Sequence, residues 1–83
     1  MEMQIQEQRL PGIGHRYELK LQRDRRLIVV VQDRGRRELG VISGAAEGPD
    51  VVVSLTQDQA VALAALLTGA RFSLSAVVEP LAG

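Results

Sequence analysis

An unbroken run of aliphatic, mostly β-branched residues, Leu27 to Val31, constrains the fold of this chain more than any other feature. Such residues favour extended backbone, and a continuous apolar run is typical of a strand buried on both faces at the centre of a sheet. Turn-forming residues bound the run, at 23–26 before it and at Asp33-Arg34-Gly35 after it. The sequence therefore predicts a central strand at 27–31 with a chain reversal on each side.

The segments flanking this run alternate between apolar and polar residues, as half-buried strands do. Residues 15–22 place Tyr17, Leu19 and Leu21 on one face and charged residues on the other, and Leu39 and Val41 share a face in 37–42. We therefore expect a three-stranded antiparallel meander. Extended segments at 3–8, 51–53 and 71–75 are candidates to widen it.

Glycines and a proline mark the structural turns, which we assign to Pro11, Gly12, Gly14 and Gly35. Proline followed by glycine favours a type II turn, because proline fixes φ and glycine accepts the positive φ that follows. The pattern Gly12-Ile13-Gly14 lacks the third glycine and the following helix of a dinucleotide-binding loop, so a turn is the preferred interpretation.

The segment Thr56-Gln57-Asp58-Gln59 has the pattern of a capping box and predicts the start of a helix. The helix should run through the apolar residues 60–67 and end at Gly69, which suits a left-handed C-terminal cap. The predicted fold class is α+β: a small antiparallel meander of four to five strands with this helix packed on it. We expect one domain over residues 1–75, with 76–83 as a linker or tail.

The predicted helix is apolar on more than one side past its first turn. One stripe, containing Ala60, Leu63, Ala64 and Leu67, would pack against the sheet. Four residues off that stripe form a candidate protein interface, and they are Val61, Ala62, Ala65 and Leu66. Two explanations stay open: a dimer or interdomain contact covers this surface, or alanines merely favour the helix and the loop 43–53 covers the rest.

Composition argues against catalysis and against metal or cofactor binding. The chain has no cysteine and a single histidine, His15, and its carboxylates are scattered through turns and termini. These residues offer no nucleophile with a base, no paired carboxylates and no ligand set for a metal. We therefore expect no enzyme activity and no cofactor.

Two arginine clusters, Arg23/Arg25/Arg26 and Arg34/Arg36/Arg37, fall in successive turns of the expected meander. They suggest an alternative function, a small nucleic-acid or nucleotide-binding module. Successive turns lie at opposite ends of a meander, however, and the formal net charge is zero. We therefore expect solvated turns, with ion pairs to Asp24, Asp33 and Glu38.

Several motifs occur in an order that resembles a known family. They are Leu-Pro-Gly-Ile-Gly at 10–14, the Val-rich strand, Asp-Arg-Gly-Arg-Arg-Glu at 33–38, Pro49-Asp50 and a helix at 56–69 that ends near a glycine. In this respect the chain is similar to the N-terminal domain of the soluble regulatory subunits of bacterial potassium (cation)/proton antiporters.

The resemblance implies a cytoplasmic protein that is peripheral to the inner face of the cell membrane and controls cation transport through protein contacts. The implied partners are a membrane antiporter subunit, a second copy in a homodimer, and a C-terminal ligand-binding domain of the TrkA-C type. The sequence given contains no such C-terminal domain, and no ligand-binding residue of the family has a counterpart in it. Nucleic acid is not among the implied partners.

Overall fold

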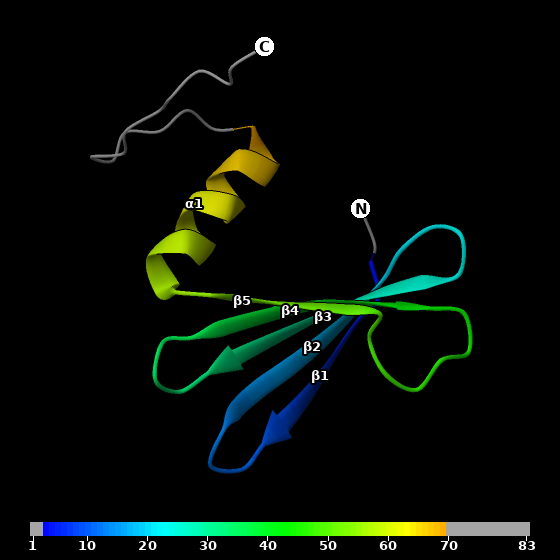
Figure 1. The fold of residues 1–83 in the computed structure, drawn as a ribbon, viewed down its shortest axis with the longest axis horizontal. Helices are drawn as coiled ribbons and strands as arrows, with labels where there is room; N and C mark the ends of the chain where they lie inside the picture. Colours follow the sequence, from blue (N-terminus) through cyan, green and yellow to red (C-terminus); the bar gives the residue numbers. More distant parts are fainter. Residues whose placement is uncertain (1–2, 70–83) are drawn as a thin grey trace.

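The computed structural model describes residues 3–69, which form a twisted antiparallel sheet followed by a helix (Figure 1). The elements are β1 (Ile5–Leu10), β2 (Gly14–Lys20), β3 (Arg25–Gln32), β4 (Arg37–Ser43), β5 (Val51–Leu55) and α1 (Gln57–Thr68). Each strand pairs with the next, in the spatial order β1-β2-β3-β4-β5. The predicted α+β meander is confirmed, with the run 27–31 in its central strand.

Two of the predicted structural turns have the geometry that the sequence indicates. Gly12 has φ +76° and the Ile13 amide donates to the Leu10 carbonyl at 2.9 Å, as a type II turn requires. Gly35 has φ +93° in the β3–β4 turn, where its amide donates to the Gln32 carbonyl. Positive φ values at these positions account for the two glycines.

Gly14 differs from that expectation, because it opens β2 instead of forming part of the turn. It is buried, has φ +151° and pairs with Gln32 of β3. A Cβ at this position would lie 1.9 Å from the carbonyl oxygen of Val31. Glycine is thus required by the close approach of two strands.

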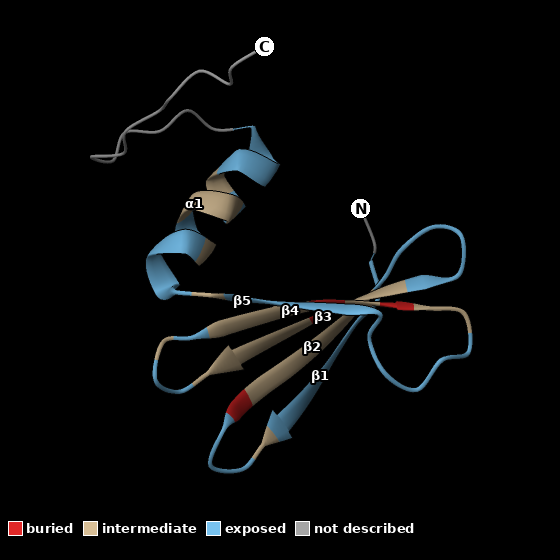
Figure 2. Cartoon of the chain, viewed as in Figure 1, coloured by how far each residue is buried: buried red, intermediate tan, exposed pale blue. Residues whose placement is uncertain are grey.

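Very little of the described chain is buried. The buried hydrophobic residues are Ile28 and Ile42, with 7% and 2% of their surface exposed (Figure 2). The predicted burial of the central strand on both faces is therefore wrong on one face, where Leu27, Val29 and Val31 are only half-buried. The physical reason is that no described element lies over that side of the strand.

The loop 44–50 and helix α1 lie on opposite sides of the sheet (Figure 1). The loop packs against β4, where a Cβ on Gly40 would lie 3.0 Å from Cβ of Pro49. It covers Ile28 and Ile42 and does not cover the helix, so the loop is not what shields the second helix surface. That part of the second explanation for the apolar helix is wrong.

Helix α1 has the predicted capping box and C-terminal cap. Thr56 Oγ1 accepts from the Gln59 amide at 3.2 Å, the Gln59 side chain accepts from the Thr56 amide at 3.0 Å, and Gly69 is left-handed with φ +78°. The helix contacts the sheet chiefly through β5 and has no buried residue.

The stripe expected to pack on the sheet is only partly covered, since Leu67 is 77% exposed. A single residue, Thr56, connects β5 to α1, so the chain has no loop with which to lay the helix flat on the sheet. The predicted strand at 71–75 and the linker at 76–83 lie outside the described residues.

Candidate interaction surfaces

The pairing of the strands sorts their side chains into two faces of different chemistry. Residues that pair directly point to the same face, and successive residues of a strand point to opposite faces. One face carries eleven apolar residues drawn from all the strands, and we call it the apolar face. Its apolar residues are Ile5, Tyr17, Leu19, Leu27, Val29, Val31, Leu39, Val41, Val51, Val53 and Leu55.

The apolar face is open along its whole width in the described part of the chain. Val51 and Val53 on β5 are 64% and 48% exposed, and Ile5 on β1 is 59% exposed. Residues on the three inner strands, such as Val29 and Leu39, are half-buried by their neighbours in the sheet. Contiguous apolar surface of this kind marks a site of protein contact.

Charged residues on the apolar face lie at its margins. Glu7 and Arg9 are on the edge strand β1, while Arg25 and Arg37 are the first residues of β3 and β4. Between these margins, the centre of the apolar face contains no charged side chain. An apolar centre with a polar margin is the usual anatomy of a protein interface.

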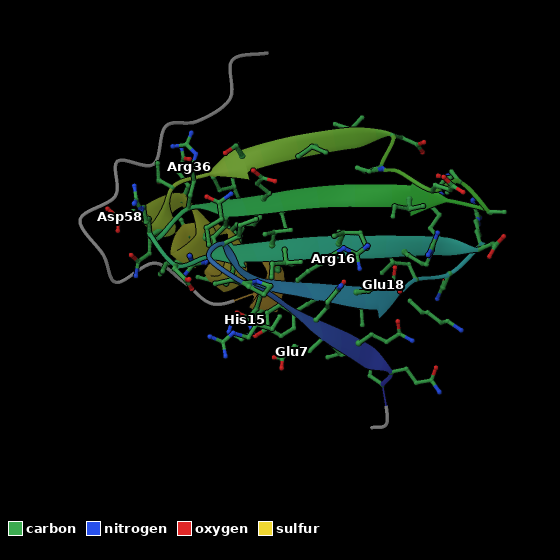
Figure 3. All side chains as sticks on the ribbon, turned by 90° about the horizontal axis from the view of Figure 1, so that it is seen from below. Glu7, His15, Arg16, Glu18, Arg36 and Asp58 are labelled. Atoms are coloured by element: carbon green, nitrogen blue, oxygen red, sulfur yellow. The ribbon has the colours of Figure 1, made fainter. Side chains whose placement is uncertain are left out.

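The opposite face carries the ion pairs of the sheet, while its apolar residues Ile28 and Ile42 are covered by the loop 44–50, and we call it the polar face. Glu18 accepts from Arg26 of β3 at 3.2 Å and lies 3.6 Å from Arg16. Figure 3 labels Arg16 and Glu18 on β2. The side-chain amide of Gln32 donates to the Glu38 carboxylate at 3.1 Å. The charged groups of this face are paired with one another or exposed to water. This face therefore needs a protein partner less than the apolar face does.

The predicted ion pairs of the arginine clusters are wrong in their partners. Arg26 is a strand residue of β3 and reaches Glu18 on the adjacent strand instead of Asp24 in the turn. Arg36 donates to Ser54 Oγ at 2.9 Å, and Arg37 donates to the Gln32 and Arg36 carbonyls. The sheet register accounts for the pair between Arg26 and Glu18, whereas Arg37 bonds to carbonyls of its own β3–β4 turn.

The two arginine clusters lie at opposite ends of the sheet, as expected for successive turns. Arg36 lies at the end where α1 begins, near Asp58, whereas the β2–β3 turn is at the far end (Figures 1 and 3). A continuous basic stripe for a nucleic-acid backbone is therefore not formed, and the nucleic-acid alternative gains no support.

A hollow of about 270 Å³ opens on the polar face beneath the loop 44–50. Apolar side chains such as Val30 and Val52 line its floor, and Arg16, Glu38 and Glu47 stand at its margin. Two carboxylates and one guanidinium surround the hollow. Because their charges are opposite, the hollow does not favour a ligand of either charge. Among the described residues, no group of three His, Asp or Glu side chains is placed to hold a metal ion.

His15 and Tyr17 lie next to each other on the apolar face, with ring centroids 6.3 Å apart. The His15 Nδ1 atom is buried without a hydrogen-bond partner. A hydrogen bond to Glu7, together with burial and the negative charge of Glu7, raises the pKa of Tyr17 above its usual value. These groups give the face one polar edge, near β1.

The four candidate interface residues on α1 differ in exposure. Val61 and Leu66 are 51% and 59% exposed, whereas Ala62 and Ala65 are half-buried. The structure thus leaves two large side chains of this set open to contact. The apolar face of the sheet was not among the sequence-predicted sites, although the alternation of Tyr17 and Leu19 already indicated one side of it.

Comparison with known proteins supports the resemblance drawn from the sequence motifs. Residues 3–71 match the family described as K(+)/H(+) antiporter subunit KhtT, N-terminal domain. Comparison with curated proteins finds no match. In the described part of the chain, the helix is too short to cross a membrane. The chain belongs to the family of N-terminal domains of the K(+)/H(+) antiporter subunit KhtT.

Proposed function

We propose that this domain is a non-catalytic regulator of a K⁺/H⁺ antiporter and that it acts by binding the membrane subunit from the cytoplasmic side. One observation carries the proposal: α1 projects from the sheet with large apolar side chains open to solvent. Val61, Leu66 and Leu67 are 51%, 59% and 77% exposed. The exposure of such an apolar surface to water is unfavourable in free energy, and a bound protein would cover the surface.

The helix also needs a partner for its own stability. Isolated helices of about 12 to 15 residues are marginal in water, and tertiary packing normally stabilises them. Helix α1 has 12 residues and no buried side chain. Its capping box fixes where it begins, but binding to another protein would supply the packing that its own sheet does not.

A C-terminal domain of the TrkA-C type, joined after α1 in a longer subunit, is the second partner in this proposal. The helix follows β5 directly and leads toward the C-terminal end of the chain. A ligand-dependent movement of that domain could thus be passed to the antiporter through α1. The regulatory effect would then rest on protein contacts and require no chemistry in this domain.

Co-purification with the antiporter membrane subunit from the same organism tests the proposal. We expect the wild-type chain to be retained by the tagged membrane subunit in detergent. Val61→Asp and Leu66→Asp place a charge in the contact and should each reduce retention at least tenfold. Gln6→Asp is the control, because Gln6 is exposed on β1, pairs with Glu18 on the face opposite the apolar face and lies outside α1.

K⁺ efflux from vesicles that contain the membrane subunit, with and without added chain, measures the regulatory effect. A change in efflux that is lost in Val61→Asp and kept in Gln6→Asp would support the proposal. Failure of the wild-type chain to bind, or equal retention of all three variants, would contradict it.

A further inference from the structure

A second hollow, of about 370 Å³, lies between the β3–β4 turn and the start of α1. Two guanidinium groups line it, those of Arg34 and Arg36. The other lining residues are uncharged, and they are Gln32, Gly35, Thr56 and Gln57. In the described part of the chain, this hollow thus has two positive charges in its wall and no carboxylate.

The two arginines of this hollow have no carboxylate partner among the described residues. Arg36 donates from Nε to Ser54 Oγ at 2.9 Å, a contact that orients the guanidinium and leaves its charge unneutralised. Within residues 3–69, Arg34 forms no ion pair. Asp58 is at the same end of the sheet in Figure 3, but it does not line the hollow and is not paired with either arginine. The arginines of the polar face, by contrast, are paired within the chain.

The hollow borders the side of α1 on which Val61 lies. Residues four apart in a helix are neighbours on its surface, so Val61 stands one turn above Gln57. Gln57 is next to the β3–β4 turn, because a Cβ on Gly35 would lie 3.2 Å from Gln57 Oε1. Val61 is 51% exposed and belongs to the surface that we assign to the antiporter contact. A protein that covers Val61 would therefore extend over the hollow.

We propose that the membrane subunit contacts this domain through an acidic segment, whose carboxylates pair with Arg34 and Arg36 while neighbouring apolar residues cover Val61. This inference rests on the proposed function and adds the chemistry of the partner. Covering Val61 withdraws water from the hollow, and a guanidinium that loses water without gaining a carboxylate raises the free energy of the complex. An acidic segment removes that cost, because arginine binds a carboxylate through two parallel hydrogen bonds.

Partners of other chemistry satisfy fewer of these observations. A small free anion would meet the guanidiniums and leave Val61 exposed. A purely apolar partner would cover Val61 and leave both charges unpaired. A nucleic acid needs a continuous basic track, and the other arginine cluster lies at the far end of the sheet.

Retention of the chain by the tagged membrane subunit in detergent is the first test. We expect the double variant Arg34→Gln/Arg36→Gln to be retained at least tenfold less than the wild-type chain. The matched control is Arg23→Gln/Arg25→Gln, which removes the same charge from exposed residues at the far end of the sheet and should be retained like the wild type. All four side chains are exposed, so circular dichroism should show the same folded state in both variants.

Carbodiimide cross-linking tests the identity of the partner groups. Arg34→Lys keeps the positive charge and supplies an amine, which the reagent joins to a carboxylate as an amide while it takes up the water lost and becomes a urea. Mass spectrometry should find the Arg34→Lys side chain bonded to an Asp or Glu of the membrane subunit. Arg23→Lys is the matched control and should give no such product. The wild-type chain, with Lys20 as its natural lysine, gives the background.

The outcomes separate this inference from the proposed function. Equal retention of Arg34→Gln/Arg36→Gln and the wild-type chain, with Val61→Asp still lost, would overturn the inference and leave the regulatory proposal standing. A wild-type chain that is not retained at all would contradict both.

Sedimentation with phosphatidylglycerol vesicles that lack the membrane subunit distinguishes a lipid partner from a protein partner. We expect neither the wild-type chain nor Arg34→Gln/Arg36→Gln to sediment. Binding of the wild-type chain that is lost in the double variant would assign the two arginines to lipid and overturn the inference.

Discussion

Gly14 has no room for a side chain, because a Cβ would lie 1.9 Å from the Val31 carbonyl oxygen and its φ is +151°. Gly14→Ala must therefore displace β2 from β3. We expect it to lower the free energy of unfolding by about 2 to 4 kcal/mol, measured by urea denaturation with circular dichroism. Gly12→Ala, in open space at φ +76°, should cost only about 1 kcal/mol. Equal losses in the two variants would contradict this explanation of Gly14.

Tyr17 reports on the edge of the apolar face through its ionisation. Its pKa is raised by the hydrogen bond to Glu7, by burial and by the charge of Glu7, with His15 stacked beside it. A raised pKa in the folded state contributes stability below the unfolded-state pKa of about 10, and this contribution is lost as the pH rises through the folded-state value.

Glu7→Gln removes the negative charge that disfavours the tyrosinate, so we expect the pKa of Tyr17 to fall toward its usual value. The chain has one tyrosine and no tryptophan, so near-ultraviolet absorbance during alkaline titration follows this residue alone. Gln8→Ala on the other face of β1 is the control and should leave the titration unchanged. An unchanged Tyr17 titration in Glu7→Gln would show that Glu7 is not the cause.

Among single residues, local rules predicted the turn at Pro11-Gly12 and the positive φ of Gly35, because those depend on adjacent residues only. They misplaced Gly14, whose requirement comes from Val31, a residue 17 positions later in the chain that the register brings beside it. The ion pair between Arg26 and Glu18 was missed for the same reason. Contacts across the sheet depend on register, which alternation alone does not specify.

Among the elements, α1 depends on its N-terminal cap more than a packed helix would. Thr56→Ala removes the acceptor for the Gln59 amide and should destabilise the helix by about 1 kcal/mol. Since α1 contacts chiefly β5, we expect the helix to fray while the sheet persists. Far-ultraviolet circular dichroism should show lower helicity, and amide hydrogen exchange in β2 to β4 should stay slow.

Thr68→Ala provides the control at the other end of α1, where the hydroxyl bonds to the Ala65 carbonyl within the last turn. This substitution leaves no backbone amide without its acceptor, so its effect on helicity should be small. Fast amide hydrogen exchange throughout the sheet in Thr56→Ala would show that α1 and the sheet unfold as one unit. That result would contradict the prediction that the helix frays while the sheet persists.

The extent and type of most elements could be predicted from sequence, since the β-branched run, the alternating segments and the capping box are local signals. The angle of α1 to the sheet could not, because it is set by the single connecting residue Thr56. Likewise, the two-sided apolar character of the helix indicated an interface, but the larger open surface of the sheet emerges only when Val29, Leu39 and Val53 are aligned by register.

For the whole molecule, the homodimer that the family resemblance implies would couple folding to association, because the apolar face is uncovered within one copy. If two copies fold together, a tenfold dilution should lower the apparent free energy of unfolding by about 1.4 kcal/mol, because dissociation accompanies unfolding. Ile42→Ala, which empties a site that is 2% exposed beneath the loop, should cost about 2 to 4 kcal/mol and keep this dependence on concentration.

Val29→Asp puts a charge at the centre of the apolar face, between Tyr17 and Leu39. If two copies associate through this face, the variant should unfold from a monomer and lose the dependence on concentration. Urea denaturation of each protein at several concentrations separates the two effects: Ile42→Ala shifts every curve equally, whereas Val29→Asp makes the curves coincide. Coinciding curves for the wild-type chain would mean that its apolar face contributes nothing through association. The stability of the chain would then have to come from Ile28, Ile42 and the sheet hydrogen bonds within one copy.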